Sequence, residues 1–403
     1  MRPMEGTRVV ELAAWTFVPA AGAVLTEWGA EVLKIESPEG GDPQRGLISS
    51  GLVPAAAGGV NFFVEQPNHG KKSVAINVRH PDGRAALLRL CERADVFLTN
   101  WLPGPIGRAR LGVEELRAVN PAIIYVRGHG QGVRGPDADK AGYDGSSFYA
   151  RSGVLSALTY GDDPYGPTQP AAMGDLPGGQ TIAGAIAAAL FRRERTGEPS
   201  VVDVSLLAFG MWVNAPDIVQ SRLYGRPVRP MARDALLNPL VNRYVTSDGR
   251  LIQLMMLQGT RFWGETLTAL GRPDLATDER FTTPDALAAN SREGTRLLDE
   301  LFATRTFAEW KDLLAGVSGA WSPVQQGLDL YDDPQVLANG YIADVEGPSG
   351  HHFPLVANPV QFDGEPGVVT RAPELGEHTD DVLRDAGYDD DTIIQLKVDG
   401  AVL

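Results

Sequence analysis

Short runs of β-branched and other apolar residues alternate with segments of helical periodicity between residues 8 and 126. The predicted strands are residues 8–12, 31–35, 96–99 and 123–126, and the predicted helices are 20–28, 81–93 and 113–119. This alternation is typical of βαβ units, in which a helix connects two parallel strands. We therefore expect an α/β fold with a large Rossmann-like domain, whose mostly parallel sheet binds ligands beyond the carboxyl ends of its strands.

The strongest helical pattern follows at residues 178–195, which combine an alanine-rich apolar body with arginines near the end. The pattern changes at the turn-rich residues 225–230. Strand patterns at 240–246 and 251–256 and amphipathic helices at 260–270, 292–303 and 306–315 come next. We predict a discontinuous large domain at 1–224 and 335–403, ending with a strand at 354–362 and a helix at 378–386, and a smaller α+β domain at 225–334.

Composition and charge narrow the class of partner. The chain has 403 residues, of which 43% are apolar and 22% are charged, so it is expected to form compact cores rather than remain disordered. The formal net charge of -15 opposes broad attraction to nucleic acid or to anionic lipid, although a local basic pocket remains compatible with it. We expect small molecules or protein as partners, with no nucleic acid and no membrane.

Cysteine usage and hydropathy indicate a compartment. Cys91 is the single cysteine and lies in an apolar run, so an intrachain disulfide is impossible and a packed core thiol is expected. Residues 1–6 lack the apolar stretch of a signal peptide, and no segment approaches the roughly 20 apolar residues that span a bilayer. These features predict a soluble cytoplasmic protein.

Common catalytic and cofactor motifs are absent from the sequence. It contains no phosphate loop, no nucleophile elbow, no paired cysteines with metal spacing and no glycine-rich dinucleotide fingerprint after the first strand. The adjacent pair His351 and His352 is a poor metal site, because neighbours in sequence rarely converge on one ion. We expect no metal, nicotinamide or flavin.

Among the acidic residues, Asp175 is the main candidate for a catalytic role. It lies between Gly174 and the pair Gly178 and Gly179, directly before the alanine-rich helix. Glycines let a ligand approach the backbone, and a helix N-terminus favours an ionised carboxylate that can act as a nucleophile. Local sequence alone favours the other interpretation, an ordinary N-cap or N-terminal acid of that helix.

Basic residues lie where an anionic ligand would need them. Lys71 and Lys72 follow a predicted loop, and Arg108 and Arg110 follow the segment 100–104. Loops of βαβ units often carry binding residues, so these cations are candidates for holding phosphate groups. Solvated surface charge is the alternative interpretation for each of them.

Taken together, short sequence blocks along nearly the whole chain resemble those of the class III CoA-transferases, also called the carnitine dehydratase and bile-acid-inducible protein family. The family includes formyl-CoA transferase and α-methylacyl-CoA racemase. The matching blocks are residues 29–36 with 41–43, 68–73, 94–96 leading to 100, 112–121, 174–179, 196–207 and 376–379.

The resemblance implies a function and a set of site residues. The catalytic aspartate of the family matches Asp175, which would carry CoA from an acyl-CoA to a carboxylic acid through anhydride and aspartyl-CoA thioester intermediates. Coenzyme A or acyl-CoA would be a substrate, and the assembly would be an interlocked, ring-like homodimer. The residues that match CoA contacts in relatives are Glu36, Ser37, Pro38, Asn100, Trp101, Arg108, Tyr143 and Asp144.

Two alternatives follow from the same resemblance. An acyl-CoA racemase or epimerase would pair its aspartate with a histidine, but this chain has Tyr143, and a phenol with a pKa near ~10 is a poor base at neutral pH. The second alternative is a CoA-binding protein without catalytic activity. Thr16 and the loop 229–235 differ from the glutamine and the glycine-rich loop of the formyl-CoA transferase branch, so we expect neither oxalate nor formate as substrate.

Overall fold

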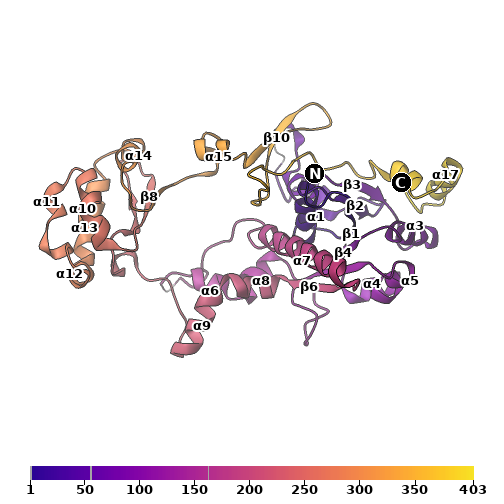
Figure 1. Ribbon diagram of the computed structural model, residues 1–403, viewed down its shortest axis with the longest axis horizontal. Coiled ribbons are helices and arrows are strands. Elements are labelled where there is room, and N and C mark those ends of the chain that lie inside the picture. The colour runs from indigo at the N-terminus through magenta and orange to yellow at the C-terminus, as the bar shows by residue number, and fades with distance from the viewer. Residues whose placement is uncertain (1, 55–56, 162) are drawn as a thin grey trace. The chain divides into compact units, whose positions relative to one another are not determined.

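The computed structural model describes residues 2–54, 57–161 and 163–403 (Figure 1). The chain forms two compact units, each described here by itself. Unit 1 comprises Met1–Ala157, Pro167–Val228 and Pro334–Leu403, and unit 2 comprises Leu158–Gly166 and Arg229–Asp333.

Unit 1 is built on a six-stranded sheet with the order β3-β2-β1-β4-β5-β6, in which all neighbouring strands are parallel. The strands are β1 (Arg8–Leu12), β2 (Glu31–Glu36), β3 (Lys72–Ala75), β4 (Val96–Thr99), β5 (Ile124–His129) and β6 (Val201–Ser205). The chain order reverses between β1 and β4, and the carboxyl ends of strands at such a point form a crevice that binds ligands. The expected Rossmann-like sheet is confirmed.

Helices cover both faces of this sheet because successive strand residues point to opposite sides. Val10 and Phe97 pack in one core with α3, α5, α16 and α17, whereas Val9 and Val96 pack in a second core with α1 and α7. The bounds are α1 (Phe17–Glu27), α3 (Pro81–Cys91), α5 (Val113–Val119), α7 (Asp175–Thr196), α16 (Thr379–Asp385) and α17 (Asp390–Val398). The C-terminal helices, yellow in Figure 1, therefore share a layer with α3.

Glycines allow α1 and α7 to approach closely. A Cβ atom added at Gly179 would lie 2.5 Å from the Cβ of Ala20 and 2.9 Å from backbone atoms of Ala21 and Phe17. All residues of α1 are buried. This close packing fixes where the first turn of α7 lies.

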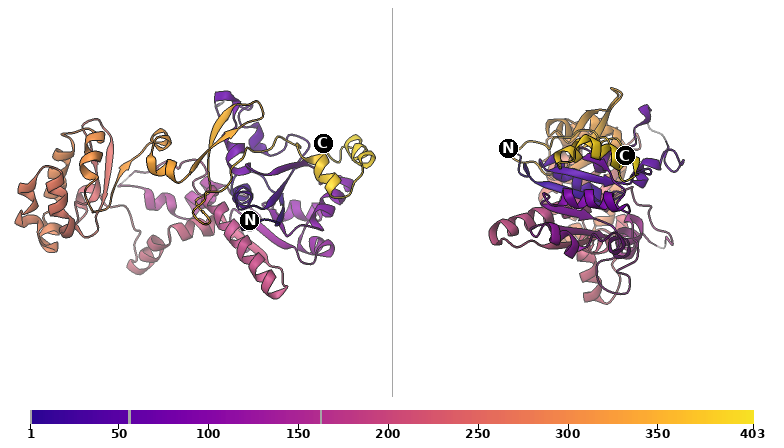
Figure 2. Two further views of the ribbon diagram at one scale, coloured as in Figure 1. Left: turned by 45° about the horizontal axis from the view of Figure 1, so that its top comes forward. Right: turned by 90° about the vertical axis from the view of Figure 1, so that its right-hand side faces the viewer.

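Further helices and two more strands belong to unit 1. They are α2 (Phe62–Asn68), α4 (Pro103–Ala109), the π-helix Asp144–Arg151, α6 (Val154–Leu158), α8 (Leu206–Val213), α9 (Ala215–Tyr224), α15 (Pro334–Ala338) and the strands β10 (Ile342–Glu346) and β11 (His352–Val356). Strands β10 and β11 form an antiparallel hairpin, drawn in orange in Figure 2. The strand expected at 354–362 is therefore shorter and begins earlier.

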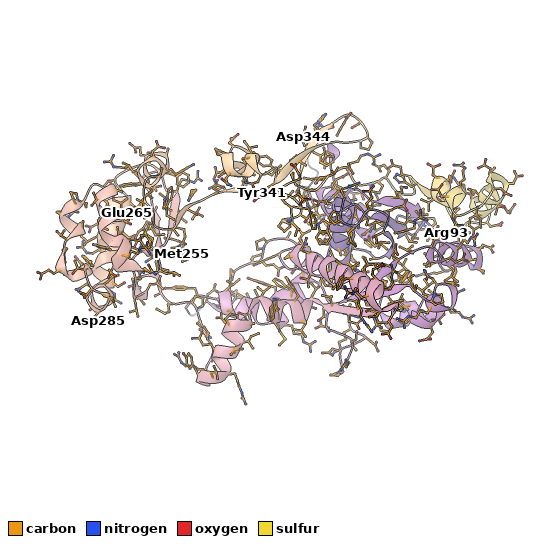
Figure 3. The ribbon with its side chains drawn as sticks, in the orientation of Figure 1. Arg93, Met255, Glu265, Asp285, Tyr341 and Asp344 are labelled. Carbon is orange, nitrogen blue, oxygen red and sulfur yellow. The ribbon has the colours of Figure 1, made fainter. Side chains whose placement is uncertain are left out.

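Unit 2 is α+β. Its antiparallel sheet has the order β7-β8-β9, with β7 (Val241–Val245), β8 (Leu251–Met255) and β9 (Trp321–Val324). Its helices are α10 (Gly259–Ala269), α11 (Pro273–Ala276), α12 (Pro284–Ala289), α13 (Ser291–Phe302) and α14 (Phe307–Leu314). Figure 3 labels Met255 on β8 and Glu265 on α10, and large aromatic side chains such as Trp263 and Trp310 fill the core between sheet and helices.

Cys91 lies fully buried as a free thiol, and burial raises its pKa to about 12. Its expected role as a packed core thiol is confirmed. Among the residues that the structure describes, no helix combines the length and apolar character needed to cross a membrane.

Candidate active site

A cavity of about 870 Å³ lies in unit 1 at the carboxyl ends of the parallel strands. The loops after β1 and β4 contribute to it, so it coincides with the point where the strand order reverses. Its lining brings together these predicted site residues: Asn100, Trp101, Arg108, Tyr143 and Asp175.

Side chains from other loops fix the backbone of the loop after β1. The side-chain amide of Asn100 accepts a hydrogen bond from Ala14 N at 3.2 Å and donates one to Ala14 O at 2.6 Å. Trp15 has a left-handed backbone conformation, with φ 67, and its amide donates to Asp42 Oδ1 at 3.2 Å. A large residue in that conformation is strained, which is typical of functional sites. The indole then meets the ring of Tyr143 edge-on, with 5.7 Å between centroids.

Asp175 is the first residue of α7, and Asp144 anchors the backbone there. The carboxylate of Asp144 accepts hydrogen bonds from Gly174 N at 3.0 Å and Asp175 N at 3.3 Å. Gly178, in the same turn, lies so close to Phe17 that an added Cβ would be 2.7 Å from its ring. The start of α7 is therefore fixed from both sides, with the side chain of Asp175 on the wall of the cavity.

Burial, and to a smaller extent the negative charge of Asp144, raise the pKa of Asp175 from its ordinary 3.8 to about 7. The sequence suggested instead that the N-terminus of α7 keeps this acid fully ionised. Desolvation outweighs the helix terminus here. A carboxylate with a pKa near neutrality is a stronger nucleophile than a solvated one, because its negative charge is less stabilised.

Cations gather at another part of the same cavity. Arg79, Arg84, Arg108 and Arg110 all line it. The guanidinium of Arg84 donates to Ala109 O at 2.9 Å and to Arg110 O at 2.8 Å, so it also fixes the loop that carries its neighbours. Clustered arginines suit the phosphate groups of an anionic ligand.

A second cavity of about 650 Å³ shares Ala14, Val78, Arg79 and Trp101 with the first, and Glu36, Ser37 and Pro38 line it. The carboxylate of Glu36 itself is already bound, because Arg45 Nη2 donates to it at 2.8 Å and Ser73 Oγ at 2.6 Å. Despite the opposing effect of burial, these hydrogen bonds lower the pKa of Glu36 to about 2. The carboxylate of Glu36 is therefore engaged by protein partners although the residue lines the cavity.

The structure separates Lys71 and Lys72 from both cavities. Lys71 is buried, and its ammonium group donates to Glu11 at 2.8 Å, Pro19 O at 2.8 Å and Asn68 Oδ1 at 3.1 Å. Lys72 pairs with Glu31 at 2.7 Å. Since an ammonium group has three donors, Lys71 has none left for a phosphate, and its contacts show it stabilising the core instead.

Sequence reasoning missed three residues that line the larger cavity, namely Arg79, Arg84 and His129. His129 and Arg79 lie at or shortly after strand ends, and Arg84 lies in the first turns of α3. His129 is the last residue of β5, and Arg79 follows β3, an edge strand that the apolar pattern did not reveal. In a parallel sheet, a polar residue at the carboxyl end of a strand is the signal that would have pointed to them.

The sequence profile of CoA-transferase family III matches residues 4–379. The chain belongs to this family, and it is an enzyme of the CoA-transferase class.

Individual relatives resemble it over nearly their full length. The chain is 31% identical over 403 residues to cinnamoyl-CoA:phenyllactate CoA-transferase of Clostridium sporogenes, covering 99% of this chain and 97% of the relative. It is 32% identical to succinate–glutarate CoA-transferase of Agrobacterium fabrum, covering 94% of this chain and 95% of the relative. The crystal structure of a CAIB/BAIF family protein from Brucella suis superposes with a TM-score of 0.82 at 30% identity, covering 96% of this chain and 99% of that one.

Proposed function

We propose that the chain transfers CoA from an acyl-CoA to a carboxylic acid through covalent intermediates on Asp175. The observation that carries the proposal is the single cavity that holds Asp175, with its raised pKa, together with the arginine cluster. A reacting thioester needs a nucleophile within the same space that binds the phosphates of CoA. Asn100, Trp101, Arg108, Tyr143 and the segment Glu36 to Pro38 would contact CoA, and Asp144 would position Asp175.

Each step exchanges one acyl bond for another. A carboxylate oxygen of Asp175 attacks the thioester carbonyl, the C–S bond breaks and CoA leaves as a thiolate, which yields a mixed anhydride. The thiolate attacks the aspartyl carbonyl, which gives aspartyl-CoA thioester and releases the donor acid. The acceptor carboxylate then attacks this thioester, and the thiolate finally attacks the acceptor carbonyl of the second anhydride. The new acyl-CoA and the free carboxylate of Asp175 result.

Isotope exchange tests this proposal. The wild-type protein is incubated with a panel of acyl-CoA and carbon-labelled acid pairs, and label entering the thioester pool is measured by mass spectrometry. Asp175→Asn should abolish exchange. Asp390→Asn, which changes an exposed acid in the first turn of α17, should retain it. Undiminished exchange by Asp175→Asn would rule out the covalent mechanism.

One observation favours the racemase alternative. Proton exchange at an α-carbon needs two acid–base groups, and His129 shares the cavity with Asp175. Loss of α-deuterium from a 2-methylacyl-CoA to water, without any acceptor acid and abolished in His129→Phe, would establish it. Retention of deuterium during CoA exchange excludes it.

We also propose that two chains form the interlocked homodimer of the family. Helix α9 has no buried residue within the single chain, and Trp212 and Leu223 are 78% and 76% exposed. Large exposed apolar side chains of this kind are typical of an interface. Light scattering should give twice the chain mass of 43.2 kDa, and a monomer at micromolar concentration would contradict the proposal.

A further inference from the structure

Trp15 lines the cavity that holds Asp175, although the proposed mechanism of CoA transfer gives it no chemical step. It lies half-buried in the loop between β1 and α1. Its backbone has a φ of 67, a left-handed conformation that a large residue adopts only when its surroundings impose it. Strain of this kind clusters at functional sites.

Residues 42–44 hold the loop at Trp15 and just after it. Asp42 Oδ1 accepts hydrogen bonds from Trp15 N at 3.2 Å and from Gln44 N at 3.0 Å. Gln44 Nε2 donates to Oγ1 of Thr16, the next residue of the loop, at 2.9 Å. Asp42 and Gln44 are both buried, so water does not compete for these hydrogen bonds.

Lys34 and Asn100 hold the loop just before Trp15. Lys34 Nζ donates to Ala13 O at 3.2 Å. The side-chain amide of Asn100 binds both backbone polar groups of Ala14. Four consecutive residues of the loop are therefore each held by a different side chain, and this fixes where the indole meets the cavity.

The course of the loop places Trp15 toward the end of the larger cavity where Asp175 lies. Ala14 lines both cavities, whereas Trp15 and Phe17 line only the larger of the two. Phe17 lies against the first turn of α7, because a Cβ atom at Gly178 would be 2.7 Å from its ring. Trp15 therefore lies between the wall that the two cavities share and the turn that carries Asp175.

The indole also reaches the segment on the other side of the nucleophile. It meets the ring of Tyr143 edge-on, with 5.7 Å between centroids. Tyr143 precedes Asp144, whose carboxylate accepts from Asp175 N at 3.3 Å. The indole thus joins the two segments that border Asp175, and a rigid ring held there limits the room beside the nucleophile.

We infer that Trp15 is a specificity-determining residue whose indole limits the bulk of the acyl group at the carbon next to the thioester carbonyl. The inference rests on the proposed function in placing the acyl group beside Asp175. Asp42 and Gln44 act through Trp15 and are positioning residues.

Binding of CoA thioethers to the full-length protein tests this inference without turnover. S-propyl-CoA, S-isobutyl-CoA and S-neopentyl-CoA differ only in methyl groups on the carbon in question, and they lack the carbonyl that Asp175 would attack. In isothermal titration calorimetry, the wild type should bind the propyl compound at least about tenfold more tightly than the neopentyl compound. Trp15→Gly should bring this ratio to about one or below, since glycine adopts a φ of 67 without strain and leaves the loop in place.

Trp101 provides the matched control. It is the same residue type, but it lines both cavities and so lies toward the wall that they share. Trp101→Ala should weaken the binding of all three thioethers alike and leave the ratio between them unchanged.

Variants of the positioning residues show whether the loop acts through the indole. Asp42→Leu removes the acceptor for Trp15 N and should lower the ratio, whereas Asp42→Asn keeps an oxygen there and should retain most of it. Gln44→Met removes the hydrogen bond to Thr16 but leaves the charge of Asp42, so it should lower the ratio even if Asp42→Leu does not fold. An unchanged ratio in Gln44→Met and in folded Asp42→Leu would overturn the positioning role.

The outcomes separate the inference from the proposed function. A wild-type ratio near one, or a ratio that survives in Trp15→Gly, overturns the inference, while CoA exchange by the wild-type protein would still support the proposed function. Failure of every thioether to bind overturns both, because the cavity would then not be the acyl-CoA site.

Discussion

Unit 1 contains two groups of buried charge with opposite construction. In the first, which we call the paired cluster, Lys34 lies 2.9 Å from Asp42 and Lys71 lies 2.8 Å from Glu11, so each ammonium has an acid. In the second, burial and the negative charge of Asp144, whose Oδ2 lies 3.3 Å from Asp175 N, raise the pKa of Asp175. A buried charge with an opposite partner is compensated, and removing that partner destabilises the fold, whereas a buried acid beside a like charge has a raised pKa that suits chemistry. The difference teaches which charged residues to assign to structure and which to chemistry.

The largest expected effect is on activity. Asp175→Asn preserves shape but removes the nucleophilic oxygen, so we expect CoA exchange to fall by about a thousandfold or more. The rate is measured under saturating acyl-CoA by mass spectrometry. A loss of less than tenfold in the rate of CoA exchange would show that Asp175 is a structural residue and not the nucleophile.

Removing a charge from the paired cluster should lower the stability of the fold. Lys71→Met leaves Lys34, 3.6 Å away, as the nearest ammonium to the buried acid Glu11 and removes one compensating positive charge from the cluster, so the free energy of unfolding should fall by roughly 3–5 kcal/mol. Chemical denaturation measures it. Lys72→Met is the matched control, because its side chain is 41% exposed and its pair with Glu31 should contribute no more than about 1 kcal/mol. Equal effects for the two lysines would contradict the comparison.

Asp175 should destabilise the fold at high pH. Its pKa is raised in the folded state, so the stability of its neutral form is fully present below about 3.8 and is lost as the pH rises through about 7. Asp175→Asn should therefore be more stable than the wild type by on the order of 2 kcal/mol at pH 8 and by nothing at pH 3.5. Thermal or chemical denaturation at both pH values measures the difference. If Asp175→Asn is less stable than the wild type at pH 8, the ionised carboxylate of Asp175 must be stabilised by a hydrogen bond or an ion pair, which would contradict the comparison.

The smallest effect is a shift in a pH profile. The value of kcat/KM should rise with pH through about 7 as Asp175 ionises. Asp144→Asn removes the like charge but not the burial, so this limb should move to lower pH by roughly half a unit to one unit. Thr181→Ala, a change on an exposed face of α7, provides the control. A limb that moves to higher pH would mean that Asp144 lowers the pKa of its neighbour.

Much of the fold could be predicted from local pattern. The inner strands, such as Arg8–Leu12 and Val96–Thr99, were predicted because both faces of each are largely buried and their sequences are rich in apolar residues. The edge strands Lys72–Ala75 and Val201–Ser205 were not, because they carry polar residues and gain their conformation from pairing with a neighbour.

The site was predictable in position but not in electrostatics. The glycines around Asp175 indicated a special acid, and the structure places it on the cavity wall. Its raised pKa depends on burial and on Asp144, which is remote in sequence. The role of Lys71 depends in the same way on Glu11, 60 positions earlier in the chain, so the basic character of Lys71 alone suggested phosphate binding.

Mass spectrometry of the peptide that contains Asp175 tests the central claim most directly. The protein is mixed with an acyl-CoA that supports exchange and quenched with hydroxylamine, which converts an acyl-activated carboxyl group to a hydroxamate. We predict a hydroxamate at Asp175 that depends on the acyl-CoA and is absent without it. An unmodified Asp175 in protein that is actively exchanging CoA would contradict the account.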